Sequence, residues 1–345
     1  MRACVYRQYG GPEVLEFVDR PRPVPGPGEV LVQVAVSGVN PTDWKMRRGA
    51  TAPVVFPYPE VVPHQDGAGV ITDVGEGCDV SRLGERVWLW EAAWQRAAGT
   101  AQEYVALAQD HAVFLPDKAS FDLGASIGIP ALTAHRCLTV GVGSTGRLGH
   151  DALSGRAVLV AGGAGAVGHA AIELASWSGA FVVTTVSSED KAALARAAGA
   201  DVVINYRTED AVAKVRDVVP QGVDLVVEVN APANEEIDRD VLASNGTVAA
   251  YATGPRDLSI PVRPAMMLNA RYQFIFIYTI PAAAKSAAVE DVAAAIDEGT
   301  LRVGEETGLP LHRFPLEAIR EAHTAVENGA IGKVLVEVSQ QTQPG

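Results

Sequence analysis

The chain has 345 residues, of which 48% are hydrophobic and 20% charged, a composition typical of a globular protein long enough for two domains. Its net charge of −13 and pI near 5.0 oppose binding to nucleic acid or to an anionic membrane, because both of these partners are negative. Cys4, Cys78 and Cys137 are too few and too scattered for a disulfide framework or a thiolate metal cluster. With no secretory signal and no membrane-spanning apolar run, we expect a cytoplasmic protein.

The first third of the chain is rich in predicted β-strands. Apolar runs at 29–40, 67–77, 87–90 and 100–106 are interrupted by Gly and Pro, which indicates short strands in a barrel-like or partly antiparallel domain. This character extends over roughly residues 1–124.

A glycine-rich turn follows, in the segment RAVLVAGGAGAVGHAAIELASW at 156–177. A buried strand at 158–160 enters the turn, and apolar residues at helical spacing leave it. In this pattern Gly163 allows a tight turn, Gly165 lets the backbone approach a pyrophosphate, and Gly168 lets helix and strand pack closely. The N-terminus of the helix supplies unpaired N–H groups, so Gly163, Gly165, Ala166, Val167 and Gly168 are predicted to bind a dinucleotide.

Strands and helices alternate after this turn. Gly179 is expected to end the first helix, and Ser188 to cap a second one that runs to Gly199. Strands are predicted at 181–186, 202–204, 223–229 and 246–251, with a helix at 208–219. Unbroken apolar strands between helices indicate a doubly wound parallel sheet, and the fold class is therefore α/β. An aromatic strand at 272–279, an alanine-rich helix and a strand at 332–338 complete the chain.

Several motifs in this order resemble the medium-chain dehydrogenase/reductase family, and within it the zinc-independent quinone oxidoreductase branch that includes zeta-crystallin. They are GVNPTDWKMRRG at 38–49, HQDGAGVI at 64–71, GASIGIPALTAHRCL at 124–138, the glycine-rich turn, VINYR at 203–207 and the closing AHTAVENGAIGKVLVEV. The resemblance implies a GroES-like β-rich catalytic domain at 1–124 and 262–345, and a Rossmann domain at 125–261. It also implies a homodimer, and substrate held against the cofactor between the domains.

The resemblance also bears on metal binding. Related alcohol dehydrogenases hold a catalytic zinc with Cys, His and a third ligand, and these positions correspond to Asn40, Gln65 and roughly Ile129 here. Two amides and an aliphatic side chain make a poor zinc site, so no metal is expected. Without a Lewis acid, reduction of an electron-poor quinone or conjugated carbonyl is favoured over oxidation of a simple alcohol.

The end of the second Rossmann strand favours NADPH. Ser187 and Ser188 stand where an NAD-selective fold usually has an acidic residue, and Lys191 follows within reach of a 2′-phosphate. The resemblance implies that Lys191 and Tyr206 approach this phosphate. Two other interpretations compete with this one: Lys191 as a solvated helix residue, and Glu189 as an acceptor for the ribose hydroxyls of NADH; the resemblance favours NADPH.

Further cofactor contacts follow from the resemblance alone. Pro130 and Thr133 correspond to a segment beneath the nicotinamide, and Asn230 ends a strand that faces the cofactor. Phe276 offers backbone contacts to the carboxamide, and Lys333 borders the nucleotide. The aromatic side chains of the strand at 272–279 are expected to be core residues or an edge that pairs with a second copy of the chain.

Asn40, Asp43 and Tyr58 are the predicted residues of the acceptor pocket, with Trp44 as a neighbour. By resemblance, Asn40 hydrogen-bonds a substrate oxygen, although a turn before Pro41 also accounts for it. Asp43 is expected to orient this loop as a helix N-cap rather than to transfer protons.

Two other functions remain open. One is an enoyl reductase that acts on an α,β-unsaturated ketone or thioester, for which the three tryptophans at 88–99 would line an entrance, or simply pack. The other is a crystallin-like protein that binds NADPH without turnover.

Overall fold

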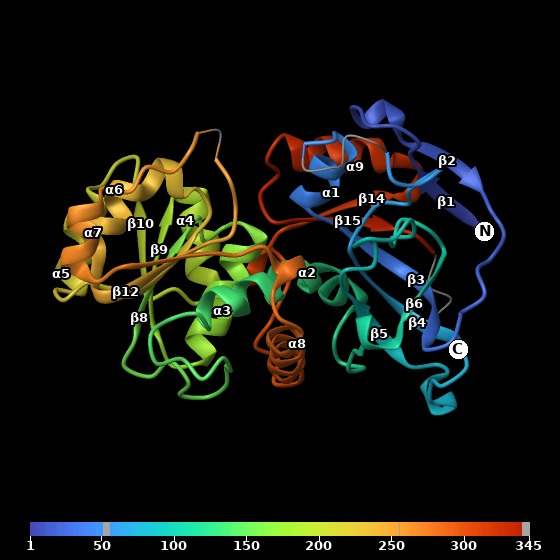
Figure 1. Ribbon diagram of the computed structural model, residues 1–345, viewed down its shortest axis with the longest axis horizontal. Coiled ribbons are helices and arrows are strands. Elements are labelled where there is room, and N and C mark those ends of the chain that lie inside the picture. The colour runs from blue at the N-terminus through green and yellow to red at the C-terminus, as the bar shows by residue number, and fades with distance from the viewer. Residues whose placement is uncertain (51–55, 255, 340–345) are drawn as a thin grey trace. The chain divides into compact units, whose positions relative to one another are not determined.

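The computed structural model describes residues 1–50, 56–254 and 256–339, and these residues form two compact units (Figure 1). The first unit comprises Met1–Ile129 and Leu311–Gly345, and the second comprises Pro130–Pro310. Among the described residues, no helix has both the length and the apolar character needed to cross a membrane.

The first unit is built around a mixed sheet with the strand order β14-β15-β3-β4-β5-β7, to which β6 adds by pairing with β3. A separate antiparallel pair is formed by β1 and β2. The strands are β1 (Arg2–Val5), β2 (Glu16–Asp19), β3 (Glu29–Val39), β4 (Asp66–Val74), β5 (Arg86–Leu89), β6 (Tyr104–Ala108), β7 (Ala112–Phe114), β14 (Leu311–Pro315) and β15 (Lys333–Glu337). The helices are α1 (Pro41–Arg47), the first half of α2 (Phe121–Leu138) and α9 (Ile319–Glu327), with 3-10 turns η1 (Pro12–Val14), η2 (Val80–Arg82), η3 (Gln109–His111) and η6 (Leu316–Ala318).

Strand β3 connects several strands of this sheet. It pairs antiparallel with β4, β6 and β15, and its register with β4 shifts twice along its length. Such irregularities bend a strand, so that one strand can serve partners on different sides. Its inward side chains, Val30, Val32 and Val34, are fully buried. The pairing with β15 brings the C-terminal segment of the chain back into the first unit.

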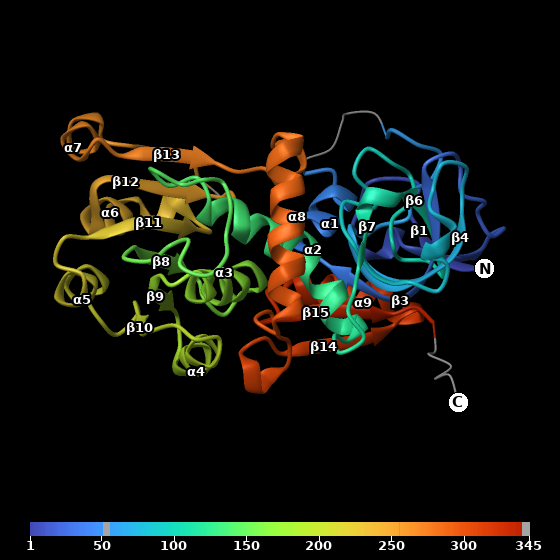
Figure 2. The ribbon, with the colours of Figure 1, turned by 90° about the horizontal axis from the view of Figure 1, so that it is seen from below.

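The second unit is a parallel sheet with the order β10-β9-β8-β11-β12-β13. Figure 2 shows the strands stacked in this order, with α5 and α6 on one face and α3 on the other. Covering both faces explains why the strands are continuous apolar runs. The strands are β8 (Ala157–Ala161), β9 (Phe181–Val186), β10 (Val202–Asn205), β11 (Val223–Glu228), β12 (Leu242–Ala250) and β13 (Arg271–Phe274). The helices are α3 (Ala166–Trp177), α4 (Glu189–Ala197), α5 (Ala211–Val218), α6 (Ala231–Val241), α7 (Val262–Leu268) and α8 (Ala282–Asp297), with 3-10 turns η4 (Ile277–Thr279) and η5 (Glu305–Thr307).

The helix signals of the second unit are confirmed. The Ser188 hydroxyl accepts the Lys191 N–H at the start of α4, and Gly179 follows α3 with a φ of 80°. The alternating strands and helices give the predicted α/β class.

The segment 262–310 differs from its predicted place. It was expected in the first domain, but β13 pairs parallel with β12, and 262–310 therefore belongs to the second compact unit. The physical reason is that β12 would otherwise have a free edge, and β13 pairs with the backbone groups along that edge. The predicted strand at 272–279 also ends early, at Phe274, and Ile277–Thr279 is a 3-10 turn instead.

Candidate functional site

The glycine-rich turn between β8 and α3 is shaped by what surrounds each glycine. A Cβ on Gly168 would lie 2.3 Å from the carbonyl oxygen of Gly162, and one on Gly163 would lie 2.2 Å from Thr184 Oγ1. At Gly165 the nearest atom, the carbonyl oxygen of Gly162, would be 3.6 Å away, an ordinary van der Waals contact, so a Cβ fits here. Gly162, which the sequence analysis did not single out, takes the left-handed conformation of the turn with a φ of 74°.

The start of α3 is suited to a phosphate group. Gly165 is the N-cap, and among the described residues no side chain bonds to the exposed N–H groups of the first turn. These groups and the positive end of the helix dipole favour an anion. The cradle and the free donors therefore fit the diphosphate of a dinucleotide.

A second polar cluster follows β9. Lys191 Nζ donates to Ser187 Oγ at 3.0 Å, which holds an ammonium group beside a hydroxyl group. The nearby Tyr206 side chain is 49% exposed, and Glu189 is directed to Arg196 at 2.7 Å. Since Glu189 is paired with a cation, the donors that remain at this strand end match a phosphate better than ribose hydroxyls.

The other predicted cofactor residues lie in different places. Pro130 and Thr133 are buried within α2, and Asn230 is the N-cap of α6. The buried Oδ1 of Asn230 has no hydrogen-bond partner among the described residues. Phe276 lies beyond the end of β13 and is 48% exposed.

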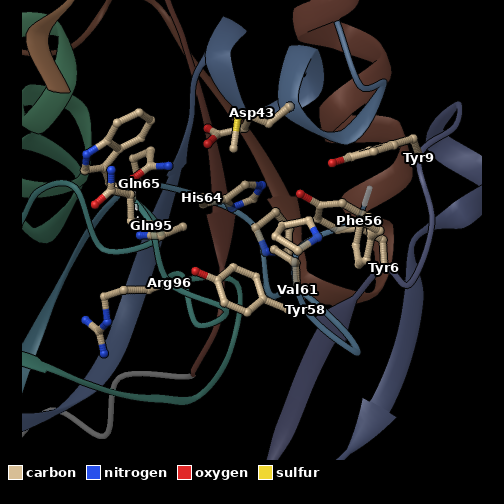
Figure 3. Close-up of a pocket in the computed structure, with 15 residues that line it drawn as sticks. Tyr6, Tyr9, Asp43, Phe56, Tyr58, Val61, His64, Gln65, Gln95 and Arg96 are labelled. Carbon is tan, nitrogen blue, oxygen red and sulfur yellow. Dashed lines mark hydrogen bonds between the residues drawn. The ribbon is translucent and has the colours of Figure 1, made fainter. Parts of the chain in front are cut away.

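An aromatic pocket lies in the first unit (Figure 3). Its volume is about 450 Å³, within the range of small-molecule sites. Phe56 lines it and contacts Tyr6 and Tyr9 edge-to-face, with centroid distances of 5.6 and 5.1 Å. The full lining is Tyr6, Tyr9, Asp43, Met46, Phe56, Pro57, Tyr58, Val61, Pro63, His64, Gln65, Ala93, Trp94, Gln95 and Arg96.

The backbone around this pocket is unusual. His64 has a φ of 81° and Gln95 a φ of 55°, and both residues line the pocket. Glu91, in the same loop as Gln95, has a φ of 50°. Non-glycine residues in this region carry a conformational cost and tend to gather at functional sites.

Two of the predicted acceptor residues, Asp43 and Tyr58, line the pocket, whereas Asn40 and Trp44 do not belong to its described lining. Of the tryptophans at 88–99, Trp94 lines the pocket, whereas Trp88 is fully buried in β5 and Trp90 stacks on His111 at 4.2 Å. One of the three tryptophans therefore lines the pocket, and the other two are packing residues.

Asn40 is held in a buried network with Lys333 and Asp66. Its Oδ1 accepts Lys333 Nζ at 2.7 Å, and its Nδ2 donates to Asp66 Oδ2 at 2.7 Å. Lys333 Nζ is also 3.3 Å from Asp66 Oδ2. Burial raises the pKa of Asp66 and lowers that of Lys333, while each charge opposes the shift of the other.

Asp43 occupies the third position of α1, and the N-cap is Asn40, so the prediction that Asp43 is the N-cap is wrong. Its Oδ2 accepts the backbone N–H of Asn40 at 2.7 Å, as the third residue of a capping box does. Asp43 is 3% exposed. Burial raises the pKa of its carboxyl to about 8, with Asp66 adding to the shift and Lys333 opposing it.

A directional hydrogen-bond chain fixes the protonation of two buried histidines. Thr100 Oγ1 donates to the carbonyl of Asp66 at 2.5 Å, so Ser37 Oγ must donate to Thr100 at 2.6 Å. Ser37 in turn accepts from His64 Nδ1 at 2.8 Å, which leaves His64 Nε2 as an acceptor. His323 Nε2, at 2.9 Å, must then be the donor. Burial lowers the pKa of His64 to about 3 and that of His323 well below its ordinary value, so both rings are neutral.

The donor set does not suit zinc. Asn40 Oδ1 already accepts a hydrogen bond from Lys333 Nζ, and Gln65 Oε1 accepts the backbone N–H of Ala93 at 3.2 Å. Amide groups engaged in this way are poor ligands for a metal that prefers His and Cys. Over 1–50, 56–254 and 256–339, no three His, Cys, Asp or Glu side chains are grouped to hold a metal ion.

Comparisons with known proteins define the class. Residues 26–117 match the alcohol dehydrogenase GroES-like domain, and residues 166–296 match the zinc-binding dehydrogenase model. The fold is shared with a crystal structure of an NAD-dependent alcohol dehydrogenase, at a TM-score of 0.84 and 29% identity over 98% of this chain and all of that one. A mycobacterial structure complexed with NADPH has a TM-score of 0.79 and 27% identity over 98% of this chain and 99% of the other. These matches place the chain among the medium-chain dehydrogenases/reductases.

Sequence identity to a relative identifies the family within this class. The quinone oxidoreductase of Homo sapiens is 33% identical over 344 residues, which cover 97% of each chain. The chain belongs to the quinone oxidoreductase family.

The sequence analysis missed several parts of the pocket. Tyr6, Tyr9 and Phe56 come from separate segments, and no motif marks them. Asp66 and His323 were missed as well, although Asp66 stands within the quoted HQDGAGVI segment. A charged residue directly before the apolar run of β4 was the available signal, because a buried charge needs a partner.

Proposed function

We propose that this protein is an NADPH-dependent quinone reductase that works without a metal. The observation that carries the proposal is an aromatic pocket beside buried polar groups in a chain of the quinone oxidoreductase family, together with a dinucleotide cradle in the second unit. Planar aromatic acceptors pack well against Tyr and Phe side chains. The relatives named above favour this function over enoyl reduction or nucleotide binding without turnover.

The nucleotide contacts are proposed from the second unit. Gly163, Gly165, Ala166, Val167 and Gly168 would hold the diphosphate through backbone N–H groups. Ser187, Ser188, Lys191 and Tyr206 would hold the 2′-phosphate, with Lys191 already paired with a hydroxyl. The remaining proposed contacts are Pro130, Thr133, Asn230, Phe276 and Lys333.

When bound, NADPH supplies a hydride to the acceptor. The residues of the chain supply the rest. Phe56, Tyr58 and Trp94 would hold the flat ring of the acceptor and exclude water from it. Asn40 would donate from its amide to a carbonyl oxygen, as the family resemblance implies, and Lys333 and Asp66 fix its orientation.

Steady-state kinetics test this function. NADPH oxidation by the purified protein should depend on a quinone such as phenanthrenequinone, and kcat/KM should be higher with NADPH than with NADH. Turnover of an enone but not of quinones would overturn the proposal, as would binding of NADPH without oxidation over a broad panel of acceptors.

We also propose a homodimer that associates through the β13 edge of the second unit. In the described structure β13 is the last strand of its sheet, and an edge strand of this kind can pair with another chain. Apolar side chains on and near it are exposed, with Met266 at 70%, Met267 at 75% and Phe274 at 62%. Light scattering before and after Phe274→Lys would test this interface. A cytoplasmic location stays a prediction, supported by three described cysteines that form no disulfide.

A further inference from the structure

Three ionisable groups in the first unit are buried close enough to influence one another, and their charges do not cancel when all are ionised. Lys333 and Asp66 form an ion pair at 3.3 Å, with exposed side-chain fractions of 2% and 0%. Asp43 is the third group, and within the described residues it forms no ion pair. Because an unpaired buried carboxylate is costly, this cluster is electrically balanced when it holds one additional proton.

The position of Asp43 sets it apart from the other two groups. It lines the aromatic pocket, whereas Asp66 and Lys333 do not belong to the described lining. Figure 3 shows Asp43 on α1 facing the same cavity as His64. The additional proton can therefore be stored on the one member of the cluster that a bound molecule can reach.

The carboxyl group of Asp43 is also held in place. The backbone N–H of Asn40 donates to its Oδ2 at 2.7 Å. A protonated carboxyl keeps an O–H donor while it accepts such a bond. This contact from the backbone at the start of α1 limits the freedom of the carboxyl group, as a proton donor needs.

The groups around Asp43 allow it to stay neutral. The Arg47 guanidinium, on the same helix, pairs with Glu327, and His64 and His323 are uncharged. Tyr6 also faces the pocket, and burial keeps its hydroxyl protonated by raising its pKa. None of these groups therefore offers Asp43 a free cation.

Asp66 and Lys333 are the charges that act on Asp43 from β4 and β15. Burial is the largest cause of the raised pKa of Asp43, about 8, and the negative charge of Asp66 adds to it. Lys333 and the Asn40 N–H act in the opposite direction. Burial and the negative charge of Asp66 therefore favour the protonated form of Asp43.

We propose that Asp43 is the proton donor of quinone reduction, an inference that rests on the proposed function. The quinone gains a hydride, with its electron pair, from the reduced nicotinamide, and the resulting hydroquinone anion gains a proton. For this second event the Asp43 O–H bond breaks and an O–H bond forms on the product oxygen. The Asp43 carboxylate then takes a proton from water, so that each turnover consumes one hydride and one proton.

The first test replaces Asp43 by its isostere. Asp43→Asn keeps an oxygen for the Asn40 N–H but has no acidic proton, so kcat with phenanthrenequinone should fall about 100-fold. The wild-type kcat should decline above an apparent pKa of about 8, and the variant should lack this decline. Asp79→Asn is the matched control, since Asp79 also accepts a backbone N–H at a helix start, at 2.8 Å from Ser81, and lies outside the described pocket lining. It should leave kcat and the pH profile unchanged.

A second variant separates proton transfer from a structural role. Asp66→Asn removes the negative neighbour, which lowers the pKa of Asp43, and the alkaline decline of kcat should move to lower pH. A residue that only positions the loop would not produce this shift. An unchanged decline in a folded Asp66→Asn protein would overturn the proposal.

An activity-independent measurement covers the case in which a variant does not fold. Infrared difference titration of wild-type protein with labelled aspartate should show a protonated carboxyl at pH 7 that ionises near pH 8. No such carboxyl at pH 7, or wild-type kcat in folded Asp43→Asn, would overturn the role of Asp43. Failure of the proposed function has a different signature, because wild-type protein would then not reduce quinones at all.

Discussion

The two units present their candidate sites in opposite ways. In the second unit the turn before α3 offers main-chain N–H groups, and side chains matter there mainly through their absence at glycine positions. In the first unit, buried side chains outside the described pocket lining bond to one another, among them Lys333, Asp66 and Asn40. The site in the second unit is therefore sensitive to added side-chain atoms, and the site in the first unit is sensitive to the removal of a charged group.

The largest effect is expected where a charge is removed. Lys333→Met leaves Asp66 buried without a cation, and breaking such a pair costs about 3–5 kcal/mol of unfolding free energy. Urea denaturation should show this loss. Lys191→Met, at the more exposed lysine of the second unit, should stay within about 0.5 kcal/mol of wild type. Equal losses in the two variants would abolish the contrast between the units.

The next effect comes from adding a single carbon to the glycine turn. Gly168→Ala forces its Cβ against the Gly162 carbonyl at 2.3 Å, so a loss of about 1–3 kcal/mol in stability and weaker NADPH binding are expected. Gly165→Ala places its Cβ at an ordinary contact distance of 3.6 Å and should cost less than about 1 kcal/mol, yet it should still weaken NADPH binding. Thermal unfolding and fluorescence titration together would distinguish packing from ligand approach. Undiminished NADPH affinity in Gly165→Ala would contradict the proposed cradle.

A smaller effect is expected at the phosphate cluster. Lys191→Ala removes the ammonium group held 3.0 Å from Ser187 Oγ, so KM for NADPH should rise about tenfold, equivalent to about 1.4 kcal/mol. KM for NADH should hardly change, because NADH lacks the 2′-phosphate. A parallel rise in both values would refute a specific contact with this phosphate.

The smallest effect at neutral pH is expected at His323. His323→Gln keeps an N–H donor for His64 Nε2, whereas His323→Leu does not, so the Gln variant should be the more stable. The folded pKa of each histidine lies below its unfolded value, so the unfolded state binds more protons below about pH 6.5. Stability should therefore fall on acidification towards pH 3, and His323→Gln should reduce this slope by about 1.4 kcal/mol per pH unit. An unaltered slope in urea titrations would show that His323 is not held neutral.

The two units also differ in how much of each could be predicted from the sequence. The parallel strands and the glycine turn of the second unit are local patterns, and Ser188 and Gly179 act as predicted because caps depend on neighbouring residues. The pocket of the first unit was only partly predicted. Asp43 and Tyr58 were named through family motifs, but Tyr6 and Phe56 meet only through tertiary packing.

Long-range pairing also explains the errors. The place of β13 depends on the free edge of β12, which no local pattern at 262–310 reveals. The cofactor role of Lys333, implied by the family resemblance, stays a proposal, but its partners in the structure could not be predicted. Its buried contacts with Asp66 and Asn40 join positions 267 and 293 residues away, and sequence spacing carries no information about them.

The antiparallel pairing of β15 with β3 has a consequence for synthesis of the protein. All strands of the second unit have left the ribosome before β15 is made, so that unit can fold while the chain is still growing. The first unit must wait, with one edge of β3 unprotected and Asp66 without its counter-ion, until the last residues emerge. Premature termination before Lys333 would therefore yield a nucleotide-binding half attached to an aggregation-prone one.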